Sequence, residues 1–162
     1  MKDSITETLS MKSQNALPSP EEVIPHRAPM LFLSVVDRCG DSDIVGRYRF
    51  APEDPIFKGH FPKRALVPGV LLLEGAAQTL AYWALRKAPD QLVLLTGVER
   101  AKWTCPIYPG QEVTYHVKVV KAKLGLVIAD LTASVNEEVA LTARIKGFLQ
   151  SEHSSGSSLD DT

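Results

Sequence analysis

Two side chains that can exchange protons stand close together in the sequence. His60 lies in the stretch GHFP, and Glu74 lies in an apolar run that begins at Gly69. A neutral imidazole can accept a proton at cellular pH, whereas a carboxyl group in apolar surroundings favours its protonated form. Two groups with opposite protonation can remove a proton from one atom and deliver one to another. The pair therefore predicts general acid–base chemistry.

Each of these residues also has a structural explanation. A carboxyl group within an apolar helix can be catalytic, or it can be a buried group that is satisfied by hydrogen bonds. Gln78 lies one helical turn after Glu74 on the same face, so it could orient that carboxyl group or simply pack within the helix. The sequence alone leaves both the catalytic and the structural explanation open.

The remaining histidines and the cysteines add no second chemistry. We predict a structural role for His26, a solvent-facing strand position for His116 and a place in the C-terminal tail for His153. Cys39 and Cys105 stand alone, without the clustered spacing of metal ligands. We therefore expect no metal site, no disulfide framework and no cofactor.

The apolar run predicts one long helix over residues 69–87. Because it is apolar all round, it must be covered on more than one side. Gly69 stands in its first turn, where backbone N–H groups lack partners within the helix. Gly75 is unusual inside a helix, and with Ala76 and Ala77 it could leave room for an acyl chain or allow close packing.

The rest of the chain predicts strands. Val113, Tyr115, Val117 and Val119 alternate with polar residues, which is the period of a strand with one wet face. Short connections, such as the turn at residues 136–137, make neighbouring strands antiparallel. A short helix is expected from Pro20, and the predicted strands cover 31–37, 43–50, 92–100, 112–120, 125–135 and 139–149. We predict an α+β domain whose curved antiparallel sheet encloses a central helix.

Composition sets further limits. The chain has 162 residues, 44% of them hydrophobic, which suits one domain over residues 18–150 with flexible tails at 1–17 and 151–162. Lys and Arg number 18 against 19 Asp and Glu, so the charge balance predicts no nucleic-acid partner. The first residues have no apolar core of a secretory signal, and charges interrupt every apolar run. We expect a soluble, cytoplasmic protein that does not span a membrane.

An ordered set of motifs resembles the active-site signature of bacterial 3-hydroxyacyl-[acyl-carrier-protein] dehydratases of the FabZ type. Glutamate at position 74 is similar to this type, whereas the related FabA type carries aspartate there. Lys63 and Ala65 depart from the glycine and proline that the pattern usually has. The resemblance covers roughly residues 20–150, on these residues: Gly59-His60-Phe61-Pro62, Pro68-Gly69-Val70-Leu71, Glu74, Ala77-Gln78, Ile24-Pro25-His26-Arg27, Pro29, Asp37-Arg38, Gly97 to Trp103, Pro106 and Pro109-Gly110.

The resemblance implies a hot-dog fold and a catalytic assignment. His60 would be the base that takes a proton from the α-carbon, and Glu74 the acid that protonates the departing hydroxyl. The amide of Gly69 would bind the thioester carbonyl oxygen. In this family the histidine of one protomer faces the acidic residue of the other, so the resemblance implies a homodimer, which can assemble further into a trimer of dimers.

The implied partner is an acyl carrier protein whose phosphopantetheine arm holds the acyl chain. Carrier proteins are usually acidic, so basic residues near the tunnel mouth could steer docking, although surface solvation explains them equally well. The candidates are Lys63, Arg64, Arg100 and Lys102.

Two other functions fit the predicted fold. A hot-dog thioesterase would hydrolyse the thioester, but such enzymes generally lack the combined GHFP and PGVLxxE motifs. A non-catalytic acyl-binding or assembly subunit would not need both His60 and Glu74. We therefore expect a dehydratase of fatty-acid or related polyketide-like biosynthesis.

Overall fold

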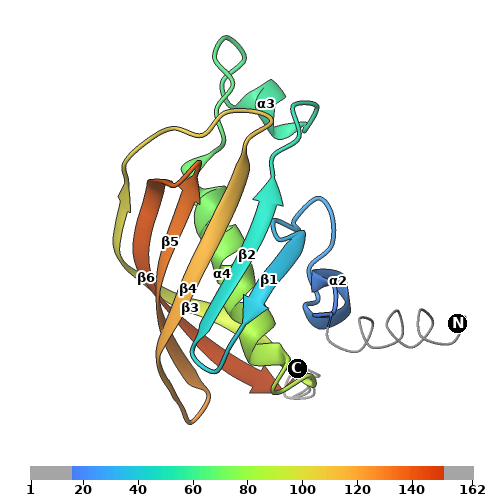
Figure 1. Ribbon diagram of the computed structural model, residues 1–162, viewed down its shortest axis with the longest axis vertical. Helices are drawn as coiled ribbons and strands as arrows, with labels where there is room; N and C mark the ends of the chain where they lie inside the picture. Colours follow the sequence, from blue (N-terminus) through green and yellow to red (C-terminus); the bar gives the residue numbers. More distant parts are fainter. Residues whose placement is uncertain (1–15, 152–162) are drawn as a thin grey trace, which may run out of the picture.

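The computed structural model describes residues 16–151, in which an antiparallel sheet wraps around one long helix (Figure 1). The six strands lie in the order β1-β2-β4-β5-β6-β3. This confirms the predicted α+β hot-dog architecture; the two predicted tails fall almost wholly outside the described residues. The elements are α2 (Pro20–Val23), β1 (Val35–Cys39), β2 (Asp43–Arg49), α3 (Ile56–Gly59), α4 (Gly69–Leu85), β3 (Gln91–Trp103), β4 (Glu112–Lys123), β5 (Leu126–Val135) and β6 (Glu138–Ser151).

The central helix α4 follows the prediction closely. It begins directly after Pro68, whose extended backbone precedes the first helical residue, and its last residues 79–85 are all buried. Strands β2 to β6 all contact it, which satisfies its all-round apolar character. The helix ends at Leu85 rather than at Lys87, although Lys87 N–H still donates to the Ala84 carbonyl in a closing turn.

Gly75 allows a close approach between α4 and the sheet. A Cβ atom there would collide with the phenol of Tyr115 on β4 and would lie 2.8 Å from the carbonyl oxygen of Phe32. Of the two roles predicted for Gly75, the structure supports close packing. The Tyr115 hydroxyl is buried without a hydrogen-bond partner within residues 16–151, and burial raises the pKa of this phenol far above its ordinary value.

Strands β4, β5 and β6 pair antiparallel in sequence order, with one register shift in each pairing. In β5 every second residue is buried, from Val127 to Val135, as the predicted alternation requires. Asn136 and Glu137 both have positive φ, 50° and 68°, which is the geometry of a tight hairpin turn with the twist of the flanking strands. The two-residue connection predicted between these strands is confirmed.

The first strand differs from the prediction. It was expected over residues 31–37, but β1 begins only at Val35. Instead of entering the sheet, the segment before it is bound by Gln78 of α4, which accepts from Phe32 N–H at 2.7 Å and donates to the Met30 carbonyl at 2.7 Å. Apolar composition alone could not distinguish a strand from a segment held by a side chain 46 residues away.

Strand β3 lies at one edge of the sheet and, among the described strands, pairs with β6 alone. Its exposed apolar residues include Leu94, Leu95 and Val98, which are 45%, 47% and 40% exposed. Long apolar edge strands are ready surfaces for pairing with another chain. Residues 16–151 therefore leave this edge incompletely covered.

Three smaller predictions can also be compared with the structure. Glu22 accepts hydrogen bonds from the Ser19 amide and hydroxyl, both at 2.7 Å, and so fixes the start of α2. Cys39 and Cys105 are free thiols. Within residues 16–151, none of the helices has the length and apolar character that crossing a membrane requires.

Candidate active site

Glu74 is held by one of its two carboxyl oxygens. The side chain of Gln78, which is fully buried, donates from Nε2 to Glu74 Oε1 at 2.9 Å. The other two bonds of the Gln78 amide fix it to the segment at Met30 and Phe32, so this amide cannot rotate freely. Gln78 therefore contacts the carboxyl group and also links α4 to the chain before β1.

A cavity of about 170 Å³ opens beside Glu74. Its floor is apolar and comes from α4, β3 and β6, where the small residues Ala77, Ala81 and Gly147 leave space between the layers. The side chain of Glu74 is 29% exposed in the single chain, so its carboxyl group reaches this cavity rather than being sealed in the core.

His26 also lines this cavity, which its sequence position did not reveal. Its Nε2 atom lies 3.6 Å from Glu74 Oε1, and its Nδ1 atom is buried without a partner among the described residues. The sequence predicts a structural role for His26 because 48 residues separate it from Glu74 and no periodicity connects them. The available signal was its inclusion in the Ile24–Arg27 motif of the family resemblance.

His60, the other residue of the predicted pair, lies directly after α3. Its Nδ1 atom is 3.1 Å from the Leu66 carbonyl oxygen, and the Leu66 amide donates back to the His60 carbonyl at 3.2 Å. Because a carbonyl can only accept, Nδ1 must carry the ring proton, which leaves Nε2 with a free lone pair. The loop thus fixes the tautomer that a general base needs.

The structure does not bring the predicted pair into one cavity of a single chain. Among the described residues that line the cavity beside Glu74, His60 is absent. His60 is half-buried at the α3 end of the molecule (Figure 1), where its ring stacks on Phe61 with centroids 4.2 Å apart. The single chain therefore does not place both residues around this cavity.

Gly69 occupies the first position of α4, as predicted. The indole of Trp103 at the end of β3 donates to the Gly69 carbonyl at 2.9 Å, and a Cβ atom at Gly69 would lie 2.6 Å from the indole nitrogen. As the first residue of the helix, Gly69 has no carbonyl four residues earlier within it to receive its N–H. The glycine is thus required by the close approach of Trp103, and its amide is free of the helix ladder.

The four basic residues predicted for docking lie in two places. Lys63 and Arg64 are exposed in the loop between α3 and α4, next to His60. Arg100 and Lys102 are exposed on β3, and Arg100 shares a surface groove with Asp130 and Arg144. The four therefore come from two separate segments of the chain.

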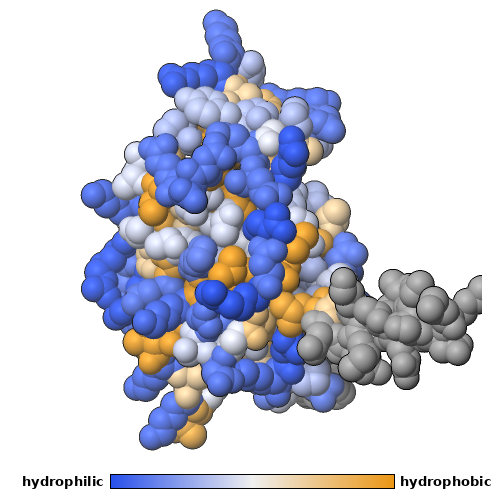
Figure 2. Space-filling view, viewed as in Figure 1, coloured by the Kyte–Doolittle hydropathy of each residue, from blue (hydrophilic) through white to orange (hydrophobic). Residues whose placement is uncertain are grey.

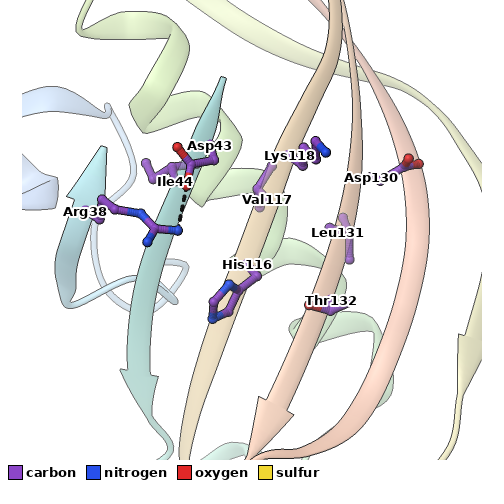
Figure 3. A pocket seen from close by; sticks show the side chains of 9 residues that line it. All are labelled: Arg38, Asp43, Ile44, His116, Val117, Lys118, Asp130, Leu131 and Thr132. Carbon is purple, nitrogen blue, oxygen red and sulfur yellow. Dashed lines mark ion pairs between the residues drawn. The ribbon is translucent and has the colours of Figure 1, made fainter. Parts of the chain in front are cut away.

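The outer face of the sheet holds a larger groove, of about 310 Å³ (Figure 3). Arg38 pairs with Asp43 at 2.5 Å, and Arg144 makes a two-point contact with Asp130 at 2.6 and 2.7 Å. Strand register aligns a row of charges of alternating sign across five strands: Asp43, Lys118, Asp130, Arg144 and Glu99. Such cross-strand pairs stabilise a sheet and balance its charge, so this groove is explained without a substrate.

The outer face of the sheet is largely polar (Figure 2), in agreement with a structural role for its charged pairs. The face shown in Figure 2 is mostly hydrophilic, with small hydrophobic areas between charged side chains. His116, predicted to face solvent, is exposed on β4 and lines the outer groove. In the described part of the chain, no group of three or more His, Cys, Asp or Glu side chains is arranged to hold a metal ion.

Comparison with known proteins places this chain in a family. A family model described as a FabA-like domain matches residues 24–144. The 3-hydroxyacyl-[acyl-carrier-protein] dehydratase FabZ of Thermotoga petrophila is 33% identical over 125 residues, which is 77% of this chain and 90% of that protein. The FabZ of Campylobacter lari is 32% identical over 136 residues, 80% of this chain and 93% of its own.

Solved structures agree on the fold. The dehydratase heterocomplex ApeI:P of Xenorhabdus doucetiae matches with a TM-score of 0.72 at 18% identity, covering 84% of this chain and 93% of that one. A hypothetical thioesterase of Streptococcus pneumoniae in complex with coenzyme A matches with a TM-score of 0.57 at 9% identity, covering 72% and 85%. At these identities the matches show the shared fold alone.

Proposed function

Because the chain belongs to the FabA-like family, we propose that it is a FabZ-type dehydratase, which converts 3-hydroxyacyl thioesters on acyl carrier protein into trans-2-enoyl thioesters and water. The reaction serves fatty-acid or related polyketide-like biosynthesis. Dehydration needs a base for the α-proton, an acid for the departing hydroxyl and a donor for the thioester oxygen. His60, Glu74 and the Gly69 amide supply these three groups.

One observation carries this proposal. Each proton-transfer side chain is held through one atom and free at the other. His60 donates from Nδ1 to Leu66, so Nε2 is available as the base. Glu74 accepts from Gln78 at Oε1, so a proton on Oε2 can be given to the leaving hydroxyl. The two side chains are therefore prepared for opposite roles.

His60 and Glu74 can carry out both proton transfers of the dehydration. His60 Nε2 takes the α-proton, and the electron pair left on the α-carbon forms the double bond to the β-carbon. The bond from the β-carbon to the hydroxyl oxygen breaks, and that oxygen receives the proton from Glu74 Oε2 and leaves as water. Negative charge that develops on the thioester oxygen is stabilised by the Gly69 amide at the positive end of α4. Proton return from His60 to Glu74 through the released water resets the site.

We propose that the active site is shared between two copies of the chain. His60 does not line the cavity beside Glu74, while the β3 edge next to that cavity exposes Leu94, Leu95 and Val98. Pairing of β3 with the same strand of a second copy would cover this edge and bring the partner's loop toward Glu74. Dimers of this kind could assemble further into a trimer of dimers.

The acyl carrier protein is the proposed partner. Lys63 and Arg64 stand in the exposed loop that follows His60, so they can attract an acidic carrier close to the site. Arg100 and Lys102 of the second copy are the other proposed contacts. The two free thiols fit a reducing compartment, and we propose that the enzyme acts in the cytoplasm.

A direct assay tests the reaction. The protein is incubated with a 3-hydroxyacyl thioester and with the 2-enoyl thioester, while enoyl absorbance and free thiol are followed together. We expect interconversion without thiol release, and Glu74→Gln should lower turnover about 100-fold or more with the fold intact. Thiol release would identify a thioesterase instead. Binding without turnover would identify a non-catalytic acyl-binding subunit.

A further inference from the structure

We propose that His26 is a positioning residue for Glu74, whose Nε2–H closes onto Glu74 Oε1 when substrate fills the cavity. This inference rests on the proposed function, because it concerns the acid of that reaction. Its basis is the placement of His26 in the wall of the cavity, 3.6 Å from the carboxyl oxygen that Gln78 also holds. A second donor on Oε1 would leave Oε2 as the only oxygen that can carry the acidic proton.

The 3.6 Å between His26 Nε2 and Glu74 Oε1 is longer than a hydrogen bond, but a small movement of either side chain would form one. Donor and acceptor must come to about 3 Å, so the two atoms need to approach by a few tenths of an ångström. Catalytic hydrogen bonds are often long in the absence of substrate and tighten when it binds. Both side chains are about 30% exposed, His26 at 30% and Glu74 at 29%, so an acyl chain in the cavity would displace water from both.

The burial of Nδ1 indicates which form of the ring does this. A proton on Nδ1 of the neutral ring would be a buried donor without a partner, whereas a proton on Nε2 faces Glu74 Oε1 at 3.6 Å. The geometry therefore favours the tautomer with its proton on Nε2. A neutral donor can orient the carboxyl group without the positive charge that would hold it as a carboxylate.

The backbone around His26 is fixed, as a positioning role requires. Ile24 is 2% exposed and anchors one side in the core. On the other side, the guanidinium of Arg27 donates to the carbonyls of Ile24, His26 and Glu21 at 2.8, 2.7 and 2.9 Å. Three bonds from one planar group hold the turn after α2, so His26 enters the cavity from a rigid segment.

The test compares side chains that keep or remove a donor at the position of Nε2. His26→Leu keeps the bulk and removes the donor, whereas His26→Gln carries an amide N–H at about the same reach. We expect His26→Leu to lower kcat about 10-fold with KM changed less than about 2-fold, and His26→Gln to recover most of the loss. His116→Leu, on the outer face of the sheet, is the matched control and should behave as wild type.

A role in packing alone would give the opposite order, with His26→Leu more active than His26→Gln, and would overturn the inference. Equal kcat for both variants would overturn it as well. If His26→Leu does not fold, His26→Asn takes its place, because its amide ends one carbon short and should be less active than His26→Gln. If the proposed function itself is wrong, the result differs: wild type does not dehydrate the substrate, or Glu74→Gln remains active.

Discussion

Gln78→Leu gives the sharpest test of how the site is built into the fold. The Gln78 amide makes three hydrogen bonds, to Phe32 N–H, the Met30 carbonyl and Glu74. Leucine fills a similar volume but leaves Phe32 N–H without an acceptor, in a residue that is 2% exposed. A buried donor without a partner costs about 1–3 kcal/mol, whereas the exposed Met30 segment can bind water.

We therefore expect Gln78→Leu to lower the free energy of unfolding by about 2 kcal/mol. For a chain of this size that corresponds to a melting temperature lower by about 4–8 °C, measured at fixed protein concentration because the protein is proposed to dimerise. Turnover should also fall, by about 10-fold, because Glu74 Oε1 loses its donor. Circular dichroism melts and the enoyl assay measure the two effects on the same samples.

Thr79→Val is the matched control. Thr79 is the neighbouring residue of α4 and is equally buried, and its hydroxyl donates to the Gly75 carbonyl at 2.8 Å. That carbonyl also accepts a helix N–H, so valine leaves no group unpaired, and the change should stay below about 1 kcal/mol. If Gln78→Leu is no less stable than Thr79→Val, the Gln78 amide is not what holds the segment at residues 30–32.

Three further predictions concern Gly69, Tyr115 and the four basic residues proposed for docking. Gly69→Ala should displace the Trp103 indole, shift its fluorescence and lower kcat/KM about 10-fold; an unchanged emission spectrum would contradict this contact. Tyr115→Phe should cost little stability at neutral pH, because the hydroxyl has no partner. The pKa of the phenol is raised in the folded state, so wild type loses stability as pH rises above about 10, and the variant should lose less. Identical stability of the two proteins throughout the alkaline range would contradict this prediction. Reversing the charge of Lys63, Arg64, Arg100 and Lys102 should lower kcat/KM about 10-fold or more with carrier-bound substrate and little with a pantetheine thioester; equal losses would count against docking.

The sequence predicted those parts of the fold that repeat a simple period. The alternation in residues 112–120 and 139–149 indicated β4 and β6, and the all-round apolar run after Pro68 indicated α4. The start of β1 was wrong, because the backbone of residues 30–32 is bound by Gln78 and not by a strand. Such a contact leaves no periodic trace in either segment.

The candidate site was predicted in the same uneven way. His60, Gly69, Glu74 and Gln78 stand within one short stretch with recognisable motifs, so their types and order indicated the chemistry. His26 reaches Glu74 only through the fold, from a turn that Arg27 holds in place. The position of β3 at the sheet edge also could not be predicted from the sequence, because it depends on a crossover that places β3 beside β6.

Subunit exchange tests the shared active site most directly. His60→Ala and Glu74→Gln are each purified, mixed under conditions that exchange subunits, and assayed after mixed dimers have been demonstrated with two affinity tags. Random pairing makes about half of the dimers mixed, and each mixed dimer holds one intact site of two, so we predict recovery of about a quarter of wild-type turnover. Demonstrated mixed dimers that remain as inactive as the two parent variants would contradict a site built from His60 of one copy and Glu74 of the other.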